Sequence, residues 1–136
     1  MIRRVRILQR VYDDAEAIFD WLAIRSEQGA NRWRDAFFAA VQALSSDADI
    51  WSSAPEAARV RTPIRQKFFK TPHGRQYRIL YRIDPEEVVV LRVRAPGEPP
   101  LSRRDLQVAR SQCSVYFLLP RQNPLAPGAA LAIITA

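Results

Sequence analysis

The chain has 136 residues, a net charge of +7 and a single cysteine. This length fits one domain with a hydrophobic core large enough to need no disulfide or structural metal. One cysteine and one histidine exclude an internal disulfide and a standard zinc centre, so we expect no metal or other cofactor and a reducing, cytoplasmic compartment. No uninterrupted apolar segment reaches the ~20 residues of a membrane span, so no membrane partner is expected.

Charge is divided unevenly along the chain. Residues 11–58 hold nine acidic and three basic residues, whereas residues 59–104 hold twelve basic and four acidic ones. Nineteen of the 21 basic residues are arginine, whose planar donor group suits phosphate and carboxylate. This asymmetry favours a polyanionic or acidic partner for one face of the protein. The alternative is that the arginines reflect genome composition alone.

A strand and two helices are predicted first. Residues 2–8 alternate apolar and arginine side chains, with the period of a half-buried strand. Asp13 or Asp14 can cap a helix expected over about residues 14–27. A second helix is indicated by apolar residues at every i, i+3 and i+4 position over residues 33–44. The apolar face of the first helix is widened by Trp21 and Ile24.

Strands dominate after a loop over residues 45–63, in which one helical turn near Glu56 is possible. Strands are expected over residues 64–69, 77–83 and 88–91, joined by turns and therefore antiparallel. Residues 88–91 are apolar on both faces, which is typical of a strand inside a sheet.

A short helix over about residues 103–111 is predicted from Ser102 and Asp105, which resemble a capping box. Beyond it, residues 114–119 form an apolar run ahead of a segment rich in proline and alanine. We expect either a poorly ordered, irregular tail or an additional edge segment there.

The order strand, helix, helix and three strands resembles the RelE/ParE toxin superfamily of bacterial type II toxin–antitoxin systems. The resemblance covers about residues 2–106 and is carried most specifically by Tyr-Arg-Ile-Leu-Tyr at residues 77–81, followed by the valine-rich segment 88–93. It implies an α+β domain over residues 1–106, in which a helical hairpin packs on one face of a twisted antiparallel sheet. Residues 107–136 are then a C-terminal extension, partly irregular.

The superfamily has two functional branches. RelE-like members resemble ribosome-dependent ribonucleases that cut mRNA, whereas ParE-like members are associated with inhibition of DNA gyrase. Arg78 matches the strand arginine that RelE-like members use against phosphate. However, residues 95–98 read Ala-Pro-Gly-Glu where those members have adjacent basic residues, and residues 102–110 contain no tyrosine. The resemblance therefore favours a ParE-like growth inhibitor. A ribonuclease and a degenerate member that only binds antitoxin are the alternatives.

Several residues are candidates for function. Arginines on the strands predict a basic face that binds phosphate or an acidic partner, unless they are simply the solvated side of the sheet. This candidate face comprises Arg78, Arg82, Arg92, Arg94, Lys67 and Lys70, with both lysines expected at the surface. If the protein is an enzyme, the catalytic candidates are Arg78, Tyr81 and His73, although Tyr81 also fits the core and His73 an exposed turn.

The expected partner is a cognate acidic antitoxin. A basic sheet with apolar flanks favours an acidic segment that folds on binding, with charge guiding the encounter and apolar contacts holding the complex. The second partner implied by the resemblance is DNA gyrase, or the ribosome and mRNA in the alternative reading.

Overall fold

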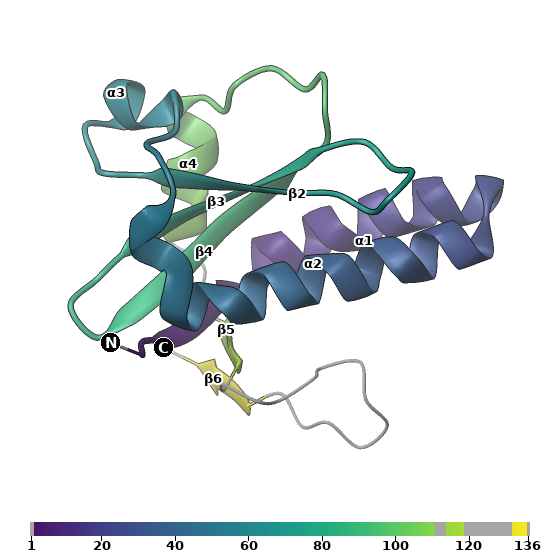
Figure 1. Cartoon of the computed structure of the whole chain (residues 1–136). Helices are drawn as coiled ribbons and strands as arrows, with labels where there is room; N and C mark the ends of the chain where they lie inside the picture. The colour runs from purple at the N-terminus through teal and green to yellow at the C-terminus, as the bar shows by residue number, and fades with distance from the viewer. Residues whose placement is uncertain (1, 111–113, 119–131, 136) are drawn as a thin grey trace.

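The computed structural model describes residues 2–110, 114–118 and 132–135, with side chains up to residue 106 (Figure 1). The protein has the expected α+β fold. Its elements in chain order are β1 (Arg4–Leu8), α1 (Gln9–Arg25), α2 (Glu27–Asp47), the 3-10 turn η1 (Ala48–Ile50), α3 (Glu56–Val60), β2 (Arg65–Phe69), β3 (Tyr77–Ile83), β4 (Glu87–Arg94), α4 (Arg103–Arg110), β5 (Ser114–Leu118) and β6 (Ala132–Thr135).

The sheet has the order β2-β3-β4-β1-β5-β6. Strands β2, β3 and β4 are antiparallel neighbours, as predicted. β1, however, pairs with β4 in parallel, with Val5 opposite Val88 and Ile7 opposite Val90, so the sheet is mixed and not purely antiparallel. β4 is apolar on both faces and lies inside the sheet between β3 and β1, and the long connection from β1 to β4, which contains the helical hairpin, permits parallel pairing. β5 pairs antiparallel with β1, which makes Ser114–Leu118 an additional strand.

The first helix begins earlier than predicted. α1 starts at Gln9, directly after β1, and Leu8 at its N-cap contributes no side-chain hydrogen bond. The expectation that Asp13 or Asp14 caps this helix was therefore wrong, because both lie inside it. The break between the two helices falls at Ser26, whose Oγ accepts a 3.0 Å hydrogen bond from the N–H of Gly29. α1 and α2 then run back along each other as the predicted hairpin (Figure 1).

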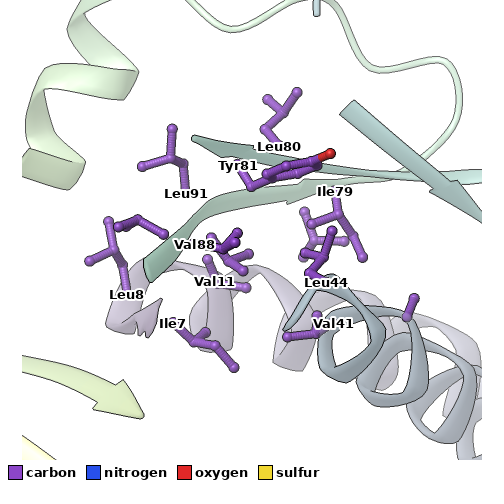
Figure 2. Close-up of a cluster of buried hydrophobic side chains, with 14 of the residues drawn as sticks. Ile7, Leu8, Val11, Val41, Leu44, Ile79, Leu80, Tyr81, Val88 and Leu91 are labelled. Carbon is purple, nitrogen blue, oxygen red and sulfur yellow. The ribbon is translucent and has the colours of Figure 1, made fainter. Parts of the chain in front are cut away.

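Buried apolar side chains lie on both sides of the sheet. Figure 2 shows Val41 and Leu44 of α2 and Ile7 of β1 on the helical side, where they pack beneath Ile79 and Val88. Leu80 and Leu91 lie on the opposite side (Figure 2). Leu101 and Leu106, just before and within α4, belong to the same buried core, and Leu106 lines one hollow with Leu91. Helical structure thus covers both faces of the central strands, as their apolar composition requires. No helix in the described part of the chain is both long and apolar enough to cross a membrane.

Candidate functional site

Arg78, the arginine matched to the RelE branch, is engaged inside the protein. Its guanidinium donates two hydrogen bonds of 2.7 and 2.8 Å to the carboxylate of Glu56, which is completely buried at the start of α3. Burial alone would raise the pKa of Glu56, but the hydrogen bonds from Arg78 and from the N–H of Leu101 outweigh it and hold the pKa below its usual value. Arg78 therefore ties β3 to α3 and to the segment that precedes α4.

Arg92 is also engaged, which contradicts the expectation that it lies on an exposed basic face. It is only 4% exposed, and its guanidinium donates hydrogen bonds of 2.6 and 2.9 Å to Asp14 of α1. The same carboxylate accepts the N–H of Val93 at 3.3 Å. Asp14 thus joins α1 to the end of β4, where a buried cation needs a partner.

The other four residues of the predicted basic face differ in their burial and in their partners. Arg82 pairs with Asp84 at 3.2 Å, and Arg94 lies 3.5 Å from Glu98. Lys67 was expected at the surface, but it is buried and its Nζ donates to Asp47 and to the carbonyl oxygen of Ala40. Of the six residues, Lys70 alone is fully exposed. Whether these residues act as a functional face stays a prediction, but five of them have carboxylate partners within the chain.

The structure does not bring the three catalytic candidates together. Tyr81 is completely buried, as its core interpretation predicted, and its hydroxyl donates a 2.6 Å hydrogen bond to the carbonyl oxygen of Ala48. Burial raises the pKa of Tyr81 well above its usual value, so the phenol stays protonated. His73 is exposed in the turn after β2, and Arg78 faces α3. Arg78 and Tyr81 both lie on β3, at positions whose side chains alternate to opposite faces of the sheet. The register of the β3–β4 pair shifts between Leu80 and Tyr81.

A groove beside the helical hairpin was not predicted. It consists of two adjoining hollows of about 350 and 590 Å³ between α1, the end of β4 and the β2–β3 turn. We call it the hairpin groove. Figure 1 shows the β2–β3 turn on the side of the helical pair where α1 ends and α2 begins. Both hollows are lined by Trp21, Arg75 and Tyr77.

Trp21 is the main exposed apolar residue of the groove. The sequence pattern placed it on the buried face of α1, yet it is 48% exposed, and the nearby Ile24 is 85% exposed. The guanidinium of Arg25 lies 3.6 Å from the centre of the Trp21 ring and covers one of its faces. Trp33 and Tyr77 line the same hollow as Trp21 and pack edge to face, with their ring centres 5.5 Å apart. The helical period could not reveal this exposure, because it does not say how far along the helix the sheet extends.

Several donor groups that line the groove have no acceptor among the described residues. Arg32 and Arg75 are exposed, and no described residue forms an ion pair or hydrogen bond with either side chain. Trp33 Nε1 and Arg92 Nη1 are buried and have no hydrogen-bond partner within the described residues. A ligand that offers carboxylate or carbonyl oxygens beside apolar groups would satisfy these donors. His73 also lines the larger hollow.

The lining of the hairpin groove has features of a binding surface. Among the described residues, no three His, Cys, Asp or Glu side chains gather where they could hold a metal ion. The groove combines an apolar floor with exposed cations, which suits a peptide segment.

Comparison with known protein families identifies the family of this chain. The family model described as "ParE toxin of type II toxin-antitoxin system, parDE" matches residues 5–98, from β1 to the turn after β4. Neither the curated proteins nor the solved structures that were searched gave a match. The family match spans more than half of the chain, including the helical hairpin, the sheet strands β1 to β4 and all residues that line the hairpin groove. The chain therefore belongs to the ParE toxin family of type II toxin–antitoxin systems, within the RelE/ParE superfamily.

Proposed function

We propose that this protein inhibits bacterial growth by acting on DNA gyrase in the cytoplasm, and that a cognate acidic antitoxin neutralises it by binding in the hairpin groove. The observation that carries the antitoxin proposal is the groove itself, which is lined by the half-exposed Trp21 and by Arg32 and Arg75, two cations without an ion pair among the described residues.

The groove suits a segment that is both acidic and apolar. Apolar side chains of the antitoxin would cover Trp21 and Ile24, and its carboxylates would pair with Arg32 and Arg75. All four strand arginines first considered for this role already have carboxylate partners in the chain. A charged partner can thus gain more at Arg32 and Arg75 of the groove, which have no carboxylate partner among the described residues.

The choice of gyrase over mRNA rests on the ParE family and on the poor fit of the ribonuclease reading. RNA cleavage needs a cation at the phosphate and a group that moves the 2′-hydroxyl proton. Arg78 is held by Glu56, and the Tyr81 hydroxyl is buried against Ala48, so neither side chain is available to a substrate in this structure. Glu98 adds a negative charge near Arg94.

The first experiment is to express the protein in a bacterial host and to assay purified gyrase with it. We expect growth arrest, inhibited supercoiling and intact transcripts. Arrest with codon-specific mRNA cleavage and normal supercoiling would contradict the gyrase proposal. Normal growth together with antitoxin binding would instead support the degenerate alternative.

The second experiment tests the groove with the antitoxin, sought as the small acidic product of the adjacent gene. Trp21→Glu removes the apolar surface and adds a negative charge, so we expect the variant to stay toxic when the antitoxin is co-expressed. Ile50→Glu is the matched control, because Ile50 is 78% exposed and does not line the groove. If the antitoxin neutralises both variants equally, it does not bind in the groove.

A further inference from the structure

Four arginines gather where α3 meets α4, on the side of the sheet opposite the helical hairpin. Arg59 lies in the last turn of α3 and Arg61 directly after it, while Arg103 and Arg104 begin α4. The two helices are in contact, and the segment before α4 donates the N–H of Leu101 to Glu56 at the start of α3. Figure 1 shows α3 close to the upper end of α4. We call these four residues the α3–α4 arginine patch.

A small hollow adjoins the patch and adds one more arginine. This hollow of about 60 Å³ is lined by Arg103 of the patch and by Val60 and Thr62, which flank Arg61 in the chain. Arg82 of β3 and Leu106 of α4 line the same hollow. Val60 of α3 and Arg103 in the first turn of α4 therefore line one hollow, which places the two ends of the patch beside each other.

The four guanidinium groups have no ion-pair partner among the described residues. All four are exposed, and none forms an ion pair or hydrogen bond with any side chain that the structure describes. Glu56 is paired with Arg78 and Asp84 with Arg82, whereas Asp105, next to Arg104 in the chain, accepts hydrogen bonds from Ser102 and forms no ion pair with the four arginines. No aspartate or glutamate follows Asp105 in the sequence, so the undescribed residues contain no side-chain carboxylate. The repulsion among these cations is therefore left for a partner to relieve.

The chemistry around the patch favours a phosphate backbone over an acidic peptide. A peptide that folds on binding needs apolar anchors, whereas the large exposed apolar side chains among the described residues are Ile2, Trp21, Ile24, Ile50 and Phe68, none of which lies in α3 or α4. The adjoining hollow of about 60 Å³ is also too small to hold a bulky apolar side chain of a peptide. Phosphate contacts need only donors and charge, which arginines supply.

The same features favour duplex DNA among nucleic acids. Single strands are usually held by stacking on aromatic side chains, and no described aromatic residue lines the hollow that adjoins the patch. Duplex RNA is recognised in part through its 2′-hydroxyl groups, which uncharged polar side chains contact. Here the hydroxyls of Thr62 and Ser102 already donate to the carbonyl oxygen of Val60 and to Asp105.

We propose that the α3–α4 arginine patch binds the phosphate backbone of duplex DNA without selecting a base sequence. The partner at this patch thus differs from the acidic segment proposed for the hairpin groove. Binding of DNA does not depend on gyrase inhibition, so the two proposals can fail separately.

The test measures fluorescence anisotropy of a short labelled DNA duplex titrated with the purified full-length chain at several salt concentrations. Four arginine–phosphate contacts should make the logarithm of the binding constant fall with the logarithm of the salt concentration, with a slope of about −3 to −4. Arg59→Glu combined with Arg103→Glu should weaken binding at least about tenfold and make the slope shallower by about 2. Arg59→Lys combined with Arg103→Lys should keep most of the affinity, since the charges remain.

The matched control is Arg32→Glu combined with Arg75→Glu, which changes the net charge equally but lies at the hairpin groove. We expect less than about a threefold loss from this control, which reports the effect of overall charge. A loss equal to that of the patch variant would overturn the assignment to the patch. Salt-independent binding, no binding, or tighter binding of duplex RNA or of a polyglutamate peptide would overturn the DNA proposal. Circular dichroism and thermal unfolding establish that the variants are folded.

Discussion

Arg78 in β3 and Arg103 in α4 both lie on the α3–α4 side of the protein, yet their surroundings are opposite. Arg78 meets a completely buried carboxylate in two hydrogen bonds, and its side chain is 16% exposed. Arg103 is exposed and has no carboxylate partner among the described residues. The same chemical group therefore organises the interior in one place and remains available to a partner in the other.

The difference shows what a strand position does to a charged residue. Arginines on central strands lie between layers, so each must bring a counter-charge or be desolvated without one. Arg78 and Arg92 have Glu56 and Asp14 for this reason. Arginines at the ends of short surface helices stay hydrated and need no internal partner. The polar face of a sheet is thus a poorer indication of a binding surface than a cluster of arginines on exposed helix ends.

Breaking the Glu56–Arg78 pair should have the largest effect. Glu56→Ala leaves the guanidinium of Arg78 and the N–H of Leu101 without a partner, and we expect it to lower the free energy of unfolding by about 3–5 kcal/mol. Urea unfolding measures this loss. Glu86→Ala is the control, because Glu86 is 85% exposed and lies 4.0 Å from Arg4, so it should cost less than about 1 kcal/mol. Equal losses in the two variants would show that Glu56 has no special structural role.

The pH dependence of the free energy of unfolding should also reveal the Glu56–Arg78 pair, with a smaller effect than removal of Glu56. Because the folded pKa of Glu56 lies below its usual value of 4.5, the unfolded chain binds a proton at this site more readily than the folded one. The stability that Glu56 contributes is therefore present above about pH 4.5 and is lost as the pH falls through the lowered folded pKa. Glu56→Gln cannot titrate, so its free energy of unfolding should fall less steeply with acid than that of the unmodified chain. Parallel curves would contradict this assignment.

The smallest effect is expected at the patch, and it should have the opposite sign. Arg61 ends α3 in the left-handed conformation with φ 53°, which costs a residue with a Cβ more than glycine. Arg61→Gly should raise the free energy of unfolding by about 0.5–1 kcal/mol while weakening DNA binding. Arg59→Gly is the control, because glycine inside the helix should lower stability by about 1 kcal/mol. Thermal unfolding distinguishes the two, and a loss of stability in both would refute the argument.

Local patterns in the sequence determined the elements and much of their order. The helical period over residues 33–44 and the alternation over residues 77–83 predicted α2 and β3, because both periods are properties of a single segment. Ser102 and Asp105 predicted the start of α4, and their reciprocal hydrogen bonds are present. The apolar segment 88–91 placed β4 inside the sheet, where it lies between β3 and β1.

Tertiary structure decided the direction of β1, the exposure of Trp21 and the partners of the arginines. Arg92 and its partner Asp14 are 78 positions apart, and Arg78 and Glu56 are 22 apart, so no local period relates them. Which arginine is paired and which is free depends on how the helices pack across the sheet. Burial and counter-charge are properties of the assembled layers, whereas a strand or helix pattern records only which side chains share a face.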